Sequence, residues 1–219
     1  MGSLSASILG ADLAHLADQV KAVEPFVDMF HIDIMDGHFV PPIALGAVVV
    51  ASLRPVTRVT FHGHLMVDAP AQYFDELREA GLDVVSFHLE AVPEPGPAIA
   101  KARGAGMDVG LTISLGTPVT AVAPYLEDID DLMLMSIEPG WSGQTLSPAV
   151  YPRLEEARRI IDAAGLGVAL EIDGGVKIEN AKAAIDAGAT VLIAASGIFG
   201  QPDPAGAAEQ LSMIAEGAA

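Results

Sequence analysis

The stretch FHIDIMDGHFV, residues 30–40, places polar side chains inside an otherwise apolar run. His31 and Asp33 are two residues apart, and a β-strand directs residues i and i+2 to the same face of its sheet. We therefore predict a strand over 29–34 that presents an imidazole and a carboxylate together. The Met-Asp-Gly sequence at 35–37 is typical of the tight turn that follows such a strand.

The rest of the chain alternates short apolar runs with longer segments of helical spacing, such as 12–24, 71–81 and 149–165. Asp12 is the expected N-cap of the first of these helices, and several helices are expected to end at a glycine. The breaker-rich VPEPGP at 92–97 is typical of a loop. The predicted strands cover 5–9, 29–34, 58–66, 84–90, 108–113, 131–136, 168–173 and 190–196.

These strands are mostly apolar on both faces, which favours a parallel sheet covered by helices. Eight strands that alternate with helices favour a closed (β/α)8 TIM barrel over a doubly wound open sheet. No linker-like segment divides the chain, so residues 1–219 are predicted to form a single barrel domain.

Composition narrows the class of protein. Hydrophobic residues make up 51% of the 219 and charged residues 18%, so a large core is available. The formal net charge of −18 argues against nucleic acid or an anionic membrane as a partner. The absence of cysteine excludes disulfides and thiolate metal ligands. The first residues lack the basic segment of a signal peptide, and no apolar run reaches about 18 residues. We expect a soluble cytoplasmic protein.

Polar residues gather near the predicted strand ends, where barrel enzymes carry their chemistry. A lone histidine in an apolar strand is more often a satisfied core residue, and Asp-Gly-Gly is often only a turn. Together they are harder to explain by packing, because buried charges are costly unless they are paired or coordinate a metal. The set comprises Ser7, His31, Asp33, His62, His64, His88, Glu90, Ser136, Glu171, Asp173 and Ser196.

From this set we select His31, Asp33, His64 and Asp173 as the ligands of one divalent ion. Two imidazoles and two carboxylates suit Zn²⁺, Fe²⁺, Mn²⁺ or Co²⁺ and fit poorly with Ca²⁺ or Mg²⁺. Such a site leaves open positions for substrate oxygens, as a catalytic metal requires.

Six motifs resemble the ribulose-phosphate 3-epimerase family, within the ribulose-phosphate-binding barrel superfamily. They follow the family order and extend across nearly the whole chain. The resemblance implies an isomerase of carbohydrate metabolism, in the pentose phosphate pathway, that interconverts D-ribulose 5-phosphate and D-xylulose 5-phosphate by inverting C3. The motifs are SILGAD (7–12), HIDIMDGHFVP (31–41), HLMV (64–67), FHLEA (87–91), MSIEPGWSGQ (135–144) and EIDGGV (171–176).

The resemblance also implies roles for individual residues. His31, Asp33, His64 and Asp173 would hold the metal. Asp33 and Asp173 would also be the acid–base pair, one on each face of the substrate. One carboxylate would remove the C3 proton, and the other would return a proton from the opposite side. The metal would stabilise the enediolate that forms between these steps.

Further residues are expected around the substrate. Only 11 residues are Lys or Arg, and none is an obvious clamp at a strand end, so we expect backbone N–H groups to hold the phosphate. The candidates are Gly174, Gly175, Ser196 and Gly197, after the seventh and eighth strands. Ser7 and His64 would contact the sugar. The segment 139–144 would form a closing lid. Its expected substrate contacts are Gly140, Trp141, Ser142 and Gly143, and Met35, Met66 and Met135 are expected to line the site.

Several positions depart from the family pattern. His62 stands where Asp is common, Ser114-Leu115 where Asn-Pro or Lys-Pro is usual, and Pro42 where Asn is usual. Ala-Ser-Gly at 195–197 replaces Gly-Ser-Ala. These departures leave a related ketose phosphate, such as D-allulose 6-phosphate, as an alternative substrate of the same C3 epimerisation.

Other classes are less well supported by the residues. A lyase of the hexulose-phosphate synthase type would need an Asp-x-Lys-x-x-Asp motif that this sequence lacks, and Lys177 is the sole conceivable nucleophile for a Schiff-base aldolase. A non-catalytic phosphate-binding barrel is the remaining alternative, although all four ligand residues are present. The expected partners are a small-molecule ketose phosphate and further copies of the chain in a homo-oligomer, with the apolar segment after Pro42 as a candidate interface.

Overall fold

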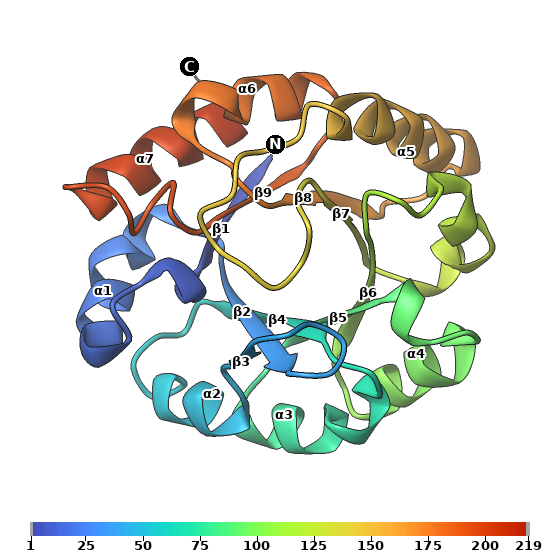
Figure 1. Cartoon of the computed structure of the whole chain (residues 1–219), viewed down its shortest axis with the longest axis horizontal. Helices are drawn as coiled ribbons and strands as arrows, with labels where there is room; N and C mark the ends of the chain where they lie inside the picture. Colours follow the sequence, from blue (N-terminus) through green and yellow to red (C-terminus); the bar gives the residue numbers. More distant parts are fainter. Residues whose placement is uncertain (1, 218–219) are drawn as a thin grey trace.

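The structure, a computed structural model, describes residues 2–217. Its sheet has the strand order β1-β9-β8-β7-β6-β5-β4-β2-β3, and pairing of β1 with β2 closes it into a barrel. All these pairs are parallel except that of β2 with the short β3, so the predicted (β/α)8 TIM barrel is confirmed (Figure 1). The strands are β1 (Ser3–Ser7), β2 (Met29–Asp36), β3 (Ile43–Ala44), β4 (Thr60–Met66), β5 (Val84–His88), β6 (Asp108–Ile113), β7 (Asp131–Met135), β8 (Ala169–Asp173) and β9 (Val191–Ala194).

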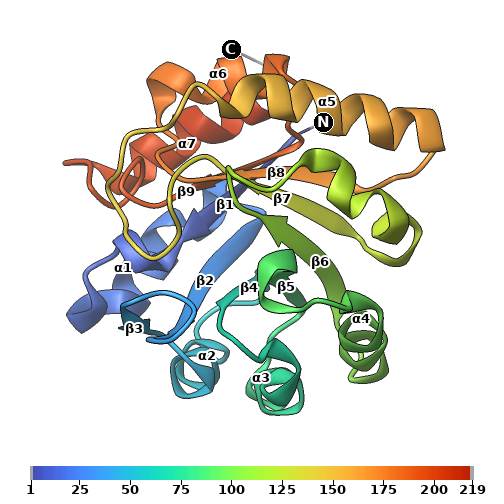
Figure 2. The same ribbon diagram turned by 45° about the vertical axis from the view of Figure 1, so that its right-hand side comes forward.

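Helices surround this barrel on the outside (Figure 2). The α-helices are α1 (Leu16–Val23), α2 (Ala47–Leu53), α3 (Phe74–Ala80), α4 (Pro95–Gly104), α5 (Val150–Ala164), α6 (Ile178–Asp186) and α7 (Pro204–Ala215). A 3₁₀ segment, Val119–Asp128, takes the place of an α-helix between β6 and β7 and contains Pro124, which cannot donate a backbone hydrogen bond. Shorter 3₁₀ turns cover Ile8–Gly10, Leu13–His15, Glu24–Phe26, Pro70–Gln72 and Leu89–Ala91.

Most helix ends follow the local signals in the sequence. The Asp12 carboxylate accepts a hydrogen bond from the Ala14 N–H, although it caps the 3₁₀ turn before α1 rather than one continuous helix. Gly81 and Gly165 adopt the left-handed conformation directly after α3 and α5. The prediction of a loop over 92–97 was wrong in its second half, because Pro95 begins α4. Proline fits the first helical position, where its missing N–H has no partner to lose.

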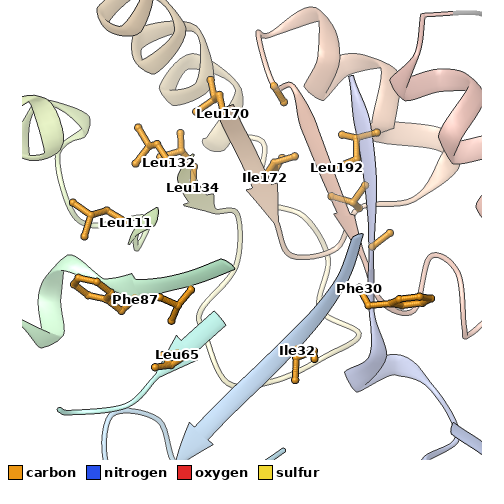
Figure 3. Packing of buried hydrophobic residues seen from close by; sticks show 14 of the residues in the cluster. Phe30, Ile32, Leu65, Phe87, Leu111, Leu132, Leu134, Leu170, Ile172 and Leu192 are labelled. Atoms are coloured by element: carbon orange, nitrogen blue, oxygen red, sulfur yellow. The ribbon is translucent and has the colours of Figure 1, made fainter. Parts of the chain in front are cut away.

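The hydrophobic core lies between the strands and the surrounding helices. Alternate strand residues point outward into it, and Figure 3 shows them packed around the barrel. On β2, Phe30 and Ile32 belong to this core, so His31 and Asp33 face the barrel interior. The labelled core residues are Phe30, Ile32, Leu65, Phe87, Leu111, Leu132, Leu134, Leu170, Ile172 and Leu192.

No helix within residues 2–217 combines the length and the apolar character that a membrane crossing requires. Residue 1 and residues 218–219, the ends of the predicted single domain, lie outside the described residues.

Candidate active site

The four predicted metal ligands come together at the carboxyl ends of three strands. His31 and Asp33 lie on β2, His64 on β4 and Asp173 on β8, and one ligand atom from each lies within 4.8 Å of the others. The parallel register of β2 and β4 places Asp33 directly beside His64. His31, Asp33 and His64 are buried, and Asp173 is half-buried.

The spacing of these atoms fits a shared ion better than direct hydrogen bonds. His31 Nε2 lies 3.4 Å from Asp33 Oδ1, and His64 Nδ1 lies 3.6 Å from both Asp33 Oδ1 and Asp173 Oδ2. Neighbouring ligands of a tetrahedral ion with bonds of about 2.0–2.2 Å lie about 3.3–3.6 Å apart. Both ring nitrogens of His31, and Nδ1 of His64, have no hydrogen-bond partner among residues 2–217. The buried cluster is therefore able to hold a metal ion.

The two carboxyl groups of this cluster have different proton affinities. Burial alone would raise the pKa of Asp33, but His31 and His64 outweigh it and hold that pKa well below its usual range. Burial raises the pKa of Asp173 to about 7, His31 opposes this, and the neighbouring charge of Asp33 adds to it. Two nearby carboxyl groups with separated pKa values are the usual basis for one base and one acid.

Metal affinity is expected to rise with pH through neutrality. Binding requires an ionised Asp173, whose pKa is about 7, and a neutral His31, whose pKa the two carboxylates raise despite the lowering effect of burial. Asp33 is already ionised at these pH values, and burial lowers the pKa of His64 to about 4, so neither group adds to the slope. Affinity should therefore increase by about ten-fold or more per pH unit between about pH 5.5 and 7. Competition with a chromophoric chelator measures this slope. Asp173→Asn should reduce the slope, and a flat profile in the unmodified protein would contradict the expectation.

A chain of side chains orients His64 from behind. His64 Nε2 lies 2.9 Å from His88 Nε2, and His88 Nδ1 lies 3.3 Å from Glu90 Oε2. Glu90 Oε1 accepts hydrogen bonds from the Ser114 N–H and the Thr117 hydroxyl. This carboxylate–imidazole–imidazole series leaves Nδ1 of His64 facing the cluster, as supporting partners of metal ligands commonly do.

Ser7 performs a similar task for Asp33. Its hydroxyl donates a 2.7 Å hydrogen bond to Asp33 Oδ2, while Oδ1 of the same carboxylate faces the two imidazoles. The carboxylate of Asp33 is thus held from one side by a donor on β1 and remains oriented toward the cluster.

A pocket opens above the cluster, at the carboxyl ends of the strands. His31 and His64 do not line it, and neither does Gly197, whose Cα approaches the Val176 carbonyl so closely that a Cβ there would collide with it. The predicted site residues that do line it are Ser7, Asp33, Met35, Met66, Met135, Gly140, Trp141, Ser142, Gly143, Asp173, Gly174, Gly175 and Ser196.

The segment between β7 and α5 covers this pocket. In Figure 1 it is the yellow loop that lies over the centre of the barrel. Gly140 and Gly143 adopt positive φ angles of 108° and 84°, and Trp141 between them is 60% exposed. A Cβ at Gly140 would press on Val40 and Pro42, so the loop tip packs against the residues that follow β2. The predicted lid is therefore placed over the site.

Gly175 supports the base of this loop. Its φ is +64°, and a Cβ there would lie 2.5 Å from the Leu146 nitrogen and 2.7 Å from the Gln144 oxygen. Gly175→Ala should therefore displace residues 144–146 and lower kcat/KM by about ten-fold or more. Steady-state kinetics measures the loss. Gly167→Ala is the matched control, because nothing lies within 4 Å of a Cβ there. Equal kinetics for the two variants would contradict this role of Gly175.

The structure also contains a second buried cluster that the sequence did not reveal. His62, one of the polar residues predicted near strand ends, lies apart from the first cluster with Asp131 and Glu171. One ligand atom from each of the three is within 4.8 Å of the others. Asp131 was missed because it begins a predicted strand at the end opposite the site. Its signal was the alternation of Asp131, Met133 and Met135, which directs all three to one face.

Sequence comparison shows similarity to one protein family over nearly the whole length of the chain. Residues 3–199 match the Ribulose-phosphate 3 epimerase family. Ribulose-phosphate 3-epimerase from Bacillus subtilis is 38% identical over 205 residues, which is 93% of this chain and 94% of that protein. The protein of the same name from Mycobacterium bovis is 39% identical over 208 residues, covering 95% and 90%.

Similarity to solved structures concerns the fold alone. The crystal structure of KGPDC from Streptococcus mutans has a TM-score of 0.73 at 17% identity, covering 99% of this chain and 98% of that one. A 3-hexulose-6-phosphate synthase structure has a TM-score of 0.70 at 21% identity, covering 97% and 99%.

Proposed function

Because this chain belongs to the ribulose-phosphate 3-epimerase family, we propose that it inverts C3 of D-ribulose 5-phosphate to give D-xylulose 5-phosphate. The observation that carries this proposal is the pair Asp33 and Asp173. Both carboxyl groups line one pocket, they come from different strands, and their pKa values lie on opposite sides of the ordinary value. Inversion requires two proton carriers on opposing faces of the carbon, and this pair supplies them.

The reaction can be assigned to the side chains of this site. Asp33, ionised and held by the Ser7 hydroxyl, takes the C3 proton, and the electron pair of the broken C–H bond moves toward the C2 carbonyl oxygen. Asp173, from another strand of the same pocket, returns a proton to C3 from the other face when it is in its protonated form. In the reverse direction the two carboxyl groups exchange roles. Met35, Met66 and Met135 line the pocket and would keep water from the reacting carbons.

His31, Asp33, His64 and Asp173 would hold one divalent ion, Zn²⁺, Fe²⁺, Mn²⁺ or Co²⁺. When bound, such an ion would supply Lewis-acid stabilisation of negative charge on the substrate oxygens. The ligand distances and the unpartnered imidazole nitrogens support this assignment.

The phosphate group would lie against the backbone of Gly174, Gly175 and Ser196, after β8 and β9. The pocket lining contains no lysine or arginine among the described residues, which supports binding by N–H groups. Gly197 would act indirectly, by allowing the close approach of this turn to Val176. Trp141, Ser142 and the flanking glycines would close over the substrate, and His64 would reach it only through the ion.

Three broader assignments belong to the same proposal. We place the enzyme in the cytoplasm, treat residues 1–219 as one barrel domain, and expect a homo-oligomer. The metabolic relatives support the first, and the continuous barrel of residues 2–217 supports the second. Exposed apolar residues on and near α2, Ile43 and Val48, support the third.

A substrate panel tests the proposal. The metal-loaded protein is assayed for C3 epimerisation of D-ribulose 5-phosphate and of hexulose 6-phosphates, including D-allulose 6-phosphate. We expect kcat/KM for the pentulose phosphate to exceed that for the hexulose phosphates by about ten-fold or more. A preference for a hexulose phosphate would establish the related epimerase instead. Binding of these ligands without turnover would indicate a non-catalytic barrel.

A further inference from the structure

A second group of ionisable side chains lies inside the barrel, nearer the starts of the strands than the first cluster. His62, Asp131 and Glu171 come from β4, β7 and β8, and they are 0%, 4% and 2% exposed. His62 and Glu171 each precede a ligand of the first cluster by two residues, so they point into the barrel one layer deeper. None of the three lines the substrate pocket.

The hydrogen bonds of Ser86 determine which nitrogen of His62 carries a proton. With Asp131 ionised, the Ser86 hydroxyl donates to Asp131 Oδ1 at 2.7 Å and therefore accepts from His62 Nε2, also at 2.7 Å. With the Nε2 position protonated, the Nδ1 atom of neutral His62 has a free lone pair. Support of one ring nitrogen by a fixed partner is how proteins prepare the other to bind a metal.

The free lone pair of His62 faces a carboxylate. Nδ1 lies 3.5 Å from Glu171 Oε2, and neither atom has a hydrogen-bond partner among residues 2–217. Asp131 Oδ2 is likewise buried without one. Burial raises the pKa of Glu171 well above its usual range. Two electron-rich atoms that face one another in a dry interior repel unless a proton or a metal ion lies between them. A separation of 3.5 Å is long for an N–H···O hydrogen bond. It matches the spacing of about 3.3–3.6 Å between neighbouring ligands of a tetrahedral ion.

Gly110 leaves the space that the Asp131 carboxylate and the Ser86 hydroxyl occupy. A Cβ at this position would collide with the Asp131 carboxylate and the Ser86 hydroxyl. The register places Ser86, Gly110 and Asp131 side by side on β5, β6 and β7. The barrel thus omits a side chain on β6 so that polar atoms from both neighbouring strands can meet.

We propose that His62, Asp131 and Glu171 bind a second divalent metal ion, of the class that takes mixed imidazole and carboxylate ligands. Zn²⁺, Mn²⁺, Fe²⁺ and Co²⁺ belong to this class. Two ionised carboxylates and a neutral imidazole balance the charge of such an ion. The site shares no residue with the first cluster and does not reach the substrate, so its ion would hold β4, β7 and β8 together.

Metal content and position test this proposal in the full-length protein. The protein is saturated with Zn²⁺, unbound ions are removed, and the number of metal ions per chain is measured. Anomalous diffraction from crystals of the same protein is then recorded at the zinc absorption edge. We expect two ions per chain in the unmodified protein, with one anomalous peak between His62 Nδ1 and Glu171 Oε2. Glu171→Gln and Asp131→Asn should each reduce the content from two to one.

The surface variant Asp162→Asn is the matched control and should retain two ions. One ion per chain at saturating zinc, with a peak only at His31, Asp33, His64 and Asp173, would overturn the proposal, since a proton would then fill the space. Two ions in Glu171→Gln would also overturn it. If the variants do not fold, the anomalous map of the unmodified protein decides alone. Absence of an anomalous peak at His31, Asp33, His64 and Asp173 would count against the catalytic metal. The peak at the second site would still be measured independently.

Discussion

Replacing Asp173 by asparagine is expected to lower kcat for conversion of D-ribulose 5-phosphate by about 10³-fold or more. An amide carries no transferable proton, so the face of C3 that Asp173 serves loses its acid. Asp33 is untouched and should still take a proton from the epimer that presents C3–H to it. In D₂O the variant should therefore exchange the C3 hydrogen of one epimer with solvent without inverting the carbon. Asp33→Asn should show the opposite selectivity.

Both carboxylates also belong to the proposed ligand set, so metal content must be measured beside turnover. Asp162→Asn, an exposed carboxylate that pairs with Arg158, is the control and should match the unmodified enzyme. Loss of turnover with the ion still bound would assign the effect to proton transfer. Turnover within about ten-fold of the unmodified enzyme, in either variant of the pair, would contradict the two-base assignment.

Removing the metal is expected to have an effect of similar size. Lewis-acid stabilisation is worth several kcal/mol, and each 1.36 kcal/mol changes a rate about ten-fold, so turnover should fall by about 10³-fold or more. Dialysis against a chelator, followed by measurement of metal content and activity, gives the result. Activity should return in proportion to the ion added back.

The substitution His64→Ala is a second way to obtain protein with little bound metal. Without the imidazole that faces both Asp33 and Asp173, the site should bind its ion at least about ten-fold more weakly. Excess metal should then restore part of the activity. Undiminished turnover by thoroughly demetallated protein would refute a catalytic metal, whatever the position of the four side chains.

The local pattern of the sequence was sufficient for the fold class and for the candidate residues from which the first cluster is drawn. The two-residue periodicity of a strand indicates which face each side chain occupies. Parallel strands bring their carboxyl ends to the same end of the barrel. His31, Asp33, His64 and Asp173 belong to the set of polar residues that this pattern placed near strand ends, and the resemblance to the family singled them out. The sequence also predicted a lid over 139–144, and the structure adds that Gly140 and Gly143 have positive φ angles.

Only the tertiary structure decided how deep each inward-facing residue lies. The depth of a side chain in the barrel depends on the register between strands that are distant in sequence. The local periodicity of the sequence carries no information about that register. His64 pairs with Asp33 on one side but with Ser86, rather than His88, on the other. The same stagger brings Asp131 to His62 and Glu171, where the sequence suggested no site. Gly197, in the turn after β9, lies beside the Val176 carbonyl rather than in the pocket. The sequence by itself therefore determined which face of its strand each side chain occupies. The closed barrel determined which of these residues meet, because the register between strands is fixed only when the barrel is assembled.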